Sequence, residues 1–294
     1  MTLQHEHPPF SPSQSSHSDN RSRPQFLKVG MVGLGSAGRQ IATALVEGAI
    51  PGVSLTAVSV RDAAKAQAFL SDRNFDIPVV PLSRLADHCD IAIEVATGAA
   101  MPEIVENISV RGTDLICVSA GGLLAIPDLE SILEANGAML QIATGAIPGL
   151  DILRSAAEGT IDSVHLTTRV KTESLAHEPF VLQQGLDFRA AAPTAPVRVF
   201  HGSAADAARA FPRHLNVAVS LSLAGIGFER TTIEMWIDPH VSGAVHSLRV
   251  EGLEIALTLE SRNVPSLNPK TSRIVAPSVL AALRSRVARI RVGS

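Results

Sequence analysis

The sequence predicts a two-domain α/β protein, in which a doubly wound parallel sheet is followed by an α+β domain with a mixed or antiparallel sheet. Within residues 26–145, short and continuously apolar runs alternate with helical patterns, which is typical of parallel strands covered by helices on both faces. After Gly145 the apolar residues alternate one by one with polar residues, as in an antiparallel sheet with one solvated face. The length of 294 residues agrees with two domains.

The domain boundaries follow from these changes of pattern. Residues 1–25 are rich in Ser, Pro, His and Gln and lack the apolar core of a secretory signal, so we expect a disordered N-terminal tail. The first domain is expected to span 26–145 and the second 146–276, with Gly145–Gly149 as the hinge. The last segment, 277–294, contains a helical pattern that we expect to pack back on the first domain.

Five strands and two principal helices are expected in the first domain. The apolar run Phe26–Val32 leads directly into a helix over Ser36–Glu47, whose apolar residues recur on one helical face. A second helix over 128–135 is closed by the Asn-Gly pair that ends at Gly137, a typical C-terminal cap. The remaining strands are the apolar runs Val53–Val60, Asp90–Ala96, Asp114–Val118 and Met139–Ala143.

Alternation predicts the strands of the second domain. Thr231–Asp238 and Leu253–Glu260 each place apolar side chains on one face and polar side chains on the other, and Val245–Val250 has a similar pattern. A helix is expected after the capping box that begins at Ser203, and another over Leu215–Ala224.

Charge and composition exclude several classes of partner. The net charge is −3, so no basic field is present to hold a nucleic acid. No apolar run reaches the length of a membrane span. Cys89 and Cys117 show neither a pairing pattern nor a metal-ligand spacing, and the histidines are scattered. We therefore expect a reducing, cytoplasmic location and no metal site.

A glycine-rich loop between the first strand and the first helix is the clearest functional signal. Residues 33–38 read G-x-G-x-x-G, the pattern of dinucleotide-binding Rossmann domains. Gly33 allows the tight turn, Gly35 lets the backbone approach a pyrophosphate, and Gly38 lets helix and strand pack closely. The unpaired N–H groups at the helix start would face the phosphates. The predicted cofactor contacts in this loop are Gly33, Gly35, Ser36, Ala37 and Gly38.

The end of the second strand bears on which dinucleotide is bound. The position where a carboxylate would bind the ribose 2′-hydroxyl holds Ser59, and Arg61 follows it closely. A small hydroxyl and a guanidinium favour a 2′-phosphate, because arginine can bind phosphate with two hydrogen bonds. We therefore favour NADP over NAD. The alternative is that Arg61 is only a solvated surface charge.

Three places in the second half carry candidate chemistry. His246 shares its strand face with apolar residues, where it is either an acid/base group or a satisfied core histidine. Asn216 falls in the first turn of an apolar helix, as a cap or as a site residue. The run 268–272, Asn-Pro-Lys-Thr-Ser, gathers a cation and two hydroxyls, and it forms either an anion pocket or an ordinary turn.

The order of these motifs resembles the L-aspartate dehydrogenase family. The resemblance is carried by the glycine loop, Ala143–Asp151, Phe211-Pro212 with Leu215–Ala218, Asp238-Pro239 followed by Val245-His246, and Asn268–Ser272. It implies a Rossmann domain with an α/β substrate domain, in a homodimer. It also implies reversible oxidative deamination of L-aspartate to iminosuccinate, and so to oxaloacetate and ammonia, with NAD or NADP taking the hydride. Iminosuccinate can feed NAD biosynthesis.

The resemblance further implies roles for individual residues. The family's catalytic histidine corresponds to His246, and its cofactor-contacting asparagine to Asn216. A cofactor contact after the strand ending near Val118 corresponds to Gly122, where relatives often have alanine. The nicotinamide is then expected near Ala96 and Thr97. The expected donors to the substrate carboxylates are Asn216, Lys270, Thr271 and Ser272.

Some positions depart from the family pattern. Relatives commonly have Asn at the positions of His214 and Ala244 and often Asp at that of Ser59, and Lys171–Val199 is longer than in compact members. Two other functions therefore remain open. One is a related two-domain dehydrogenase for another small amino or hydroxy acid. The other is a non-catalytic NADP-binding sensor.

Overall fold

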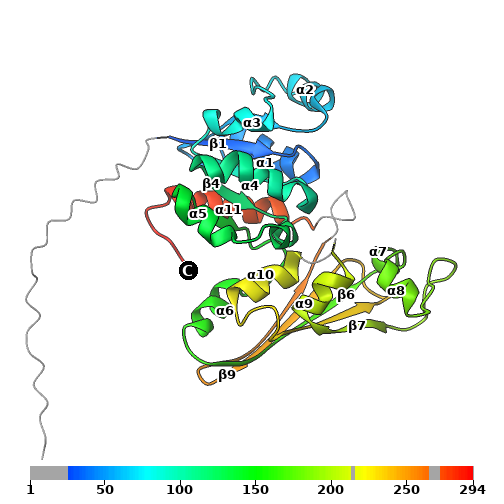
Figure 1. Ribbon diagram of the computed structural model, residues 1–294. Helices are drawn as coiled ribbons and strands as arrows, with labels where there is room; N and C mark the ends of the chain where they lie inside the picture. Colours follow the sequence, from blue (N-terminus) through cyan, green and yellow to red (C-terminus); the bar gives the residue numbers. More distant parts are fainter. Residues whose placement is uncertain (1–25, 213–215, 265–271, 294) are drawn as a thin grey trace, which may run out of the picture.

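The computed structural model of the chain describes residues 26–212, 216–264 and 272–293. Within them the chain forms two five-stranded sheets, one in each half, and both carry helices (Figure 1). The tail 1–25, for which disorder is expected, lies outside the described residues.

The first sheet has the strand order β2-β1-β3-β4-β5, and all neighbouring strands are parallel. The winding reverses between β1 and β3, so the loops after these strands form the switch point at which such sheets bind ligands. Its strands are β1 (Leu27–Val32), β2 (Val53–Ser59), β3 (Ile91–Glu94), β4 (Asp114–Cys117) and β5 (Leu140–Ile142). Its helices are α1 (Ser36–Val46), α2 (Ala63–Ser71), α3 (Leu82–Leu85), α4 (Met101–Ile108) and α5 (Leu129–Asn136).

The predictions for this part are confirmed to within two residues for the five strands, α1 and α5. α5 ends at Gly137, which adopts the left-handed conformation with φ +63° that glycine permits. The Asp62 side chain caps α2 by accepting from Lys65 N at 3.0 Å. Helices α3 and α4 were not predicted, although α4 has an apolar face of buried Met101, Ile104, Val105 and Ile108.

The second sheet has the strand order β10-β9-β6-β8-β7 and is mixed, because β6 and β8 pair in parallel while the other pairs are antiparallel. Its strands are β6 (Ile161–Val170), β7 (Val197–Ser203), β8 (Thr231–Ile237), β9 (Val245–Gly252) and β10 (Ala256–Arg262). The helices of this half are α6 (Leu150–Ala157), α7 (Thr172–Leu175), α8 (Pro179–Gln183), α9 (Ala204–Ala210) and α10 (Asn216–Ala224), and the final helix is α11 (Val275–Val287).

The strand predicted over Leu253–Glu260 is wrong at its start. β9 continues to Gly252, whose N–H donates to Ile255 O at 2.9 Å and closes a tight hairpin. Leu253 therefore lies in the turn, where its side chain is 80% exposed. The alternation holds only from Ile255 onward.

Strand β6 was missed although it is the middle strand of the second sheet. Polar His165, Thr167 and Arg169 lie on one face of β6, and buried Thr168 interrupts the apolar pattern on the other. The capping box at Ser203 is confirmed: Asp206 N donates to Ser203 Oγ at 3.0 Å, and α9 follows.

Helix α11 returns from the second half of the chain and packs beside α1 (Figure 1). Val279 and Leu283 are fully buried in the core of the first sheet. Arg286 forms an ion pair of 3.0 Å with Asp114 at the start of β4. The helix expected in the last segment is therefore present, and it covers the Rossmann-like sheet.

The long segment 171–199 is held by an aromatic cluster. Phe180 of α8 lies with its ring centroid 5.7 Å from that of Phe200 and 5.3 Å from that of Phe211. Such pairs stabilise by about 0.5–1.5 kcal/mol beyond their buried area. The segment is thus anchored to the core of the second sheet.

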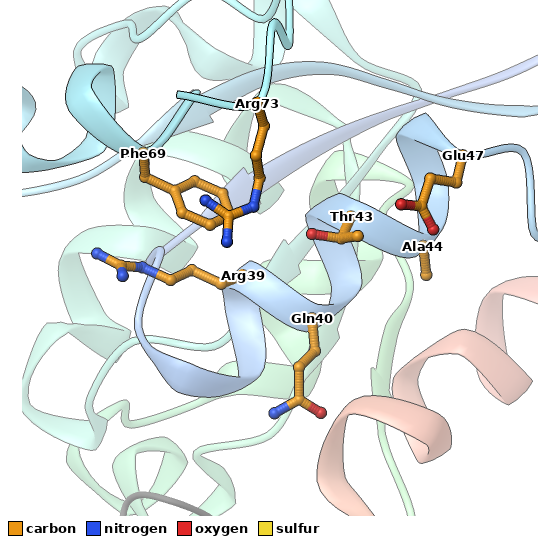
Figure 2. A pocket seen from close by; sticks show the side chains of 7 residues that line it. All are labelled: Arg39, Gln40, Thr43, Ala44, Glu47, Phe69 and Arg73. Carbon is orange, nitrogen blue, oxygen red and sulfur yellow. The ribbon is translucent and has the colours of Figure 1, made fainter. Parts of the chain in front are cut away.

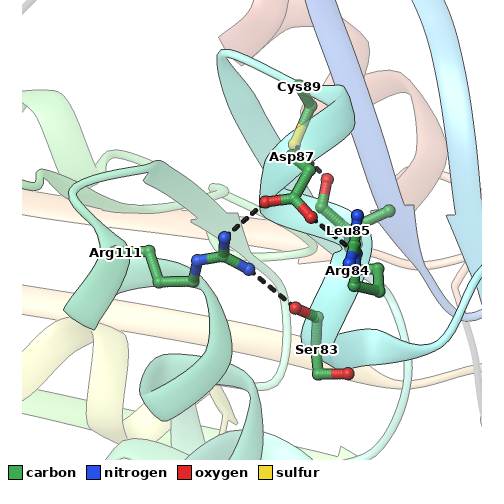
Figure 3. A network of polar contacts seen from close by, with 6 residues as sticks. All are labelled: Ser83, Arg84, Leu85, Asp87, Cys89 and Arg111. Carbon is green, nitrogen blue, oxygen red and sulfur yellow. Dashed lines mark hydrogen bonds and ion pairs between the residues drawn. The ribbon is translucent and has the colours of Figure 1, made fainter.

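A polar network ties α3 to the turn that follows α4 (Figure 3). Arg111 forms an ion pair with Asp87 and donates to Ser83 O at 2.7 Å. Asp87 also pairs with Arg84 at 2.7 Å, and Cys89 donates from Sγ to Leu85 O at 3.3 Å. Burial raises the pKa of Cys89 to about 11, so this thiol stays protonated and serves in packing.

Candidate functional site

The glycine loop between β1 and α1 has the shape that a pyrophosphate requires. Gly33 has φ +99°, and a Cβ on Gly38 would lie 2.4 Å from Gly33 O, so neither position accepts a side chain. A Cβ on Gly35 would meet no atom within 4 Å. Gly35 is also the N-cap of α1 and provides no side-chain cap, so no side chain of the cap residue occupies the first N–H groups of the helix.

The end of β2 adjoins this loop, because Gly33 N donates to Ser59 O at 2.9 Å. Ser59 is 5% exposed, whereas Arg61 is exposed and forms no ion pair within the part of the chain that the structure describes. Asp62 is occupied as the cap of α2. At this end of β2 the exposed guanidinium of Arg61 is therefore available, while the neighbouring carboxylate of Asp62 is engaged in the cap.

The loops after β3 and β4 are joined by the carboxylate of Glu94. This side chain is fully buried at the end of β3. Its Oε1 accepts from Ala96 N at 2.8 Å, and its Oε2 accepts from Val118 N at 3.1 Å and Ser119 N at 2.9 Å. A carboxylate that accepts several backbone N–H groups compensates the cost of its own burial. Glu94 therefore sets the distance between two loops that are expected to carry the nicotinamide.

The same two loops approach more closely at a pair of glycines. A Cβ on Gly122 would lie 2.3 Å from Gly98 O and 2.7 Å from Met101 Cβ. The alanine that relatives often have at position 122 thus has no room here unless Gly98 moves. Ala96 and Thr97 are exposed at this edge.

Asn216 connects the second domain to this edge. It is the first residue of α10, and its Oδ1 accepts from Gly121 N at 3.0 Å. The cap that sequence reasoning allowed for Asn216 is not observed among the described contacts; the side chain instead contacts the loop after β4. The structure thereby brings Asn216 beside Gly122.

His246 lies on β9, on the face of the second sheet that carries the helices. It is 6% exposed, and its Nδ1 lies 3.0 Å from Thr168 Oγ1 on the neighbouring strand β6. Burial lowers the pKa of His246 to about 4, so the ring is neutral near pH 7. When the threonine hydroxyl accepts from Nδ1–H, Nε2 holds the lone pair of a base.

His246 lies at the end of its sheet nearest the first domain. β9 and β10 run from their hairpin at residues 253–255 up toward the first domain (Figure 1). Ser261, opposite His246 on β10, donates to Ala146 O at 2.9 Å in the segment that joins the two halves. Ser272, one of the expected substrate donors, contacts Asn263 Oδ1 at 3.1 Å just beyond β10.

Lys270, Thr271 and His214 lie outside the described residues. Among the residues that the structure describes, no group of three His, Cys, Asp or Glu side chains could hold a metal. In the same part of the chain, no helix has the length and apolar character needed to cross a bilayer.

A cavity of about 420 Å³ lies beside the glycine loop, between α1 and α2 (Figure 2). The guanidinium carbons of Arg39 and Arg73 lie 4.8 and 4.1 Å from the ring centroid of Phe69, and Arg39 Nε donates to Leu34 O at 3.3 Å. Both arginines stack on the ring, and Arg39 also contacts the loop. The cavity contains none of the predicted site residues.

Sequence reasoning missed three residues of this region. Glu94 gave a signal, because it is the one carboxylate at the end of the apolar run 91–94. Thr168 and Asn263 gave none, since their importance depends on the register of β9 with β6 and β10.

Comparison of the sequence with known proteins gives aspartate dehydrogenases. A family model described as the C-terminal part of aspartate dehydrogenase matches residues 151–286, which include Asn216 and His246. The chain is 42% identical over 268 residues to the L-aspartate dehydrogenase of Bradyrhizobium diazoefficiens, covering 91% of this chain and 94% of that protein. It is 40% identical to L-aspartate dehydrogenase 3 of Bordetella bronchiseptica, covering 91% and 98%.

A solved structure shares the fold. The crystal structure of aspartate dehydrogenase from Thermotoga maritima matches with a TM-score of 0.68 at 24% identity, covering 91% of this chain and 99% of that one. This likeness agrees with the predicted combination of a Rossmann-type parallel sheet and a second, mixed sheet.

Proposed function

The chain belongs to the L-aspartate dehydrogenase family, and we propose that it catalyses the reversible oxidative deamination of L-aspartate to iminosuccinate, which water converts to oxaloacetate and ammonia. The observation that carries this proposal is the identity of 42% over 91% of the chain, which extends through both halves of the molecule. The geometry agrees with it, because a neutral buried histidine lies at the end of the second sheet nearest the first domain.

The cofactor is a nicotinamide dinucleotide, and the glycine loop fits it. The open space at Gly35 and the uncapped start of α1 would hold the pyrophosphate. We propose NADP as the preferred form, supported by Ser59 in place of a carboxylate and by the guanidinium of Arg61, which forms no ion pair with any residue that the structure describes. When bound, the nicotinamide supplies the hydride acceptor for deamination and the hydride donor for the reverse reaction.

His246 acts as the general base in this proposal. Its Nε2 takes a proton from the substrate ammonium or from the water that attacks the imine. The hydrogen bond between Thr168 and Nδ1 holds the ring in place. General acid–base catalysis of this kind contributes about 10²–10⁴-fold to the rate.

The substrate's carboxylates need donors at fixed positions. Asn216 and Ser272 are the described members of the expected set, and Lys270 and Thr271 complete it by resemblance. Asn216 is exposed at the domain boundary, where its Nδ2 can donate to cofactor or substrate. Orientation of the substrate is most of what these groups add, since the cofactor carries the redox step.

The decisive experiment follows the near-ultraviolet absorbance of NADH and of NADPH, in separate assays with purified protein, oxaloacetate and ammonium. Ammonium-dependent loss of the reduced cofactor is expected, faster with NADPH. The same assay is repeated with other oxo acids in place of oxaloacetate. Faster turnover of one of them identifies the related dehydrogenase suggested by Ala244. Tight cofactor binding without turnover of any acid identifies a sensor. An Arg61→Ala variant should lose affinity for NADPH and keep that for NADH.

We also propose a homodimer in the cytoplasm. The free thiols of Cys89 and Cys117 support a reducing location. The sheet face opposite the helices supports self-association. Half-buried Trp236 lies there between two arginines, with the guanidinium carbons of Arg169 and Arg198 at 5.3 and 5.9 Å from its ring centroid. Glu234 forms an ion pair with Arg198 on the same face. Mixed charge of this kind suits a two-fold interface. Light scattering should give twice the monomer mass for the wild type and the monomer mass for a Trp236→Glu variant.

A further inference from the structure

Asn263 follows the last residue of β10 and continues the ladder between β9 and β10. Its backbone N–H donates to Ala244 O at 2.9 Å. In this register Ser261 pairs with His246 and Arg262 with Val245. Side chains alternate between the faces of a sheet, so Asn263 returns to the face of Ser261 and His246. Diagonal neighbours on one face are about 7–8 Å apart, a distance that a small dicarboxylate can bridge.

The burial pattern supports this placement. Glu260 and Arg262 are exposed and pair with each other at 2.7 Å on the outer face. Ser261 turns the other way and contacts Ala146 O in the segment between the two halves of the molecule. Asn263 is half-buried on that inner side.

The side chain of Asn263 uses only one end of its amide. Oδ1 accepts from Ser272 Oγ at 3.1 Å, and Ser272 Oγ in turn lies 3.5 Å from Ile274 N, whose N–H points to it. The serine hydroxyl thus donates to Asn263 Oδ1 and faces the backbone donor with its oxygen. Nδ2 is shielded from solvent and has no hydrogen-bond partner among the described residues.

A buried donor without a partner is unfavourable by about 1–3 kcal/mol. A bound ligand that accepts from the group is one way in which such a donor is satisfied. The neighbouring groups indicate which ligand, since His246 lies on the same face and Ser272 holds the amide in position. The partner must be an acceptor, and a carboxylate oxygen gives the strongest hydrogen bond.

We infer that Asn263 donates from Nδ2 to one carboxylate of the substrate and so helps to select a dicarboxylic acid. This assignment rests on the proposed function, because it takes His246 as the group that faces the reacting end of the same molecule. The donor binds a part of the substrate that does not react. It therefore contributes equally to ground-state and transition-state binding, and its loss raises KM while kcat is retained.

The test replaces Asn263 by Asp, which keeps the shape and the acceptor for Ser272 but places an oxygen where the donor stood. Asn263→Ala removes the side chain and serves if the first variant is unstable. The matched control is Asn107→Asp on α4, a half-buried amide outside the candidate site that undergoes the same change of charge.

The measurements are KM and kcat for oxaloacetate at saturating ammonium and cofactor, together with the Kd of the reduced cofactor. For Asn263→Asp we expect a KM about 10- to 100-fold higher, kcat within about threefold, and an unchanged cofactor Kd. Asn263→Ala should raise KM about 10-fold. The control should match the wild type. A KM unchanged in both Asn263 variants overturns the inference and leaves the proposed function intact.

A wild-type protein without ammonium-dependent turnover would overturn the proposed function instead. Titration with succinate, an unreactive dicarboxylate, then tests Asn263 by calorimetry in the presence of reduced cofactor. Weaker succinate binding in Asn263→Asp than in Asn107→Asp supports the donor. Equal succinate binding in the two variants overturns the assignment of Asn263 as a donor to a carboxylate.

Discussion

Asn216 Oδ1 accepts a hydrogen bond from Gly121 N at 3.0 Å, and this contact joins α10 of the second domain to the loop after β4 of the first. The contact uses the acceptor end of the amide. The donor end, Nδ2, has no partner among the described residues and is exposed at the domain boundary. One side chain thus closes the junction and still offers a donor to a ligand.

Replacing Asn216 by Ala should weaken cofactor binding about 10-fold, because both the junction and the donor are lost. Asn216→Asp keeps the acceptor for Gly121 and loses only the donor, so its Kd for NADPH should lie between that of Asn216→Ala and that of the wild type. The measurement is the Kd of NADPH by fluorescence titration. Identical values for Ala and Asp would show that the junction contributes nothing to cofactor binding.

Glu94→Gln should loosen the loops after β3 and β4. Only one oxygen would remain to accept from Ala96, Val118 and Ser119, and the new NH₂ group would face a donor. A buried unsatisfied group costs about 1–3 kcal/mol, so the thermal midpoint should fall by several degrees and the cofactor Kd should rise. The control is Glu103→Gln, an exposed carboxylate on α4. A wild-type Kd in Glu94→Gln would contradict the positioning role.

His246→Ala should reduce kcat by about 10²–10⁴-fold, because the general base is removed. The cofactor Kd should stay near the wild-type value, since His246 lies on β9 and outside the glycine loop. Steady-state kinetics and a cofactor titration on the same preparation separate the two effects. Full activity in this variant would refute the assignment of His246.

Thr168→Val should lower kcat about 10-fold while the cofactor Kd is retained, because the hydrogen bond to His246 Nδ1 fixes the ring. Thr168→Ser keeps the hydroxyl and should recover most of the rate. The acid limb of the pH profile should shift in the Val variant and stay in place in the Ser variant. A wild-type rate in Thr168→Val would contradict a role for the threonine hydroxyl.

The stability of the fold should depend on pH through His246. Its pKa is 6.5 when unfolded and about 4 when folded. Between these values the unfolded chain binds a proton that the folded one does not, so stability falls as pH falls from 6.5 toward 4. At about pH 5 the loss relative to neutral pH is about 2 kcal/mol. Urea unfolding of wild type and His246→Gln at both pH values should show this extra loss in the wild type alone.

The elements of the first sheet could be predicted because their signals are local. Each strand is a continuous apolar run, α1 starts at a glycine loop with a defined pattern, and α5 stops at Gly137. The hairpin between β9 and β10 could not be placed correctly. Leu253 continues the apolar alternation in sequence, yet it lies in the turn, because backbone contacts of Gly252 and Leu253 close the hairpin.

The same distinction between local and long-range signals applies to the residues of the candidate site. The sequence alone determined the glycine loop, Ser59 in place of a carboxylate, and the candidate His246, since these depend on residue type and spacing along the chain. Only the tertiary structure decided that Glu94 joins two loops, that Thr168 contacts His246, and that the Nδ2 of Asn263 is buried without a partner. These features depend on which segments distant in sequence lie side by side, and that is set by the packing and register of the whole sheet rather than by any local pattern.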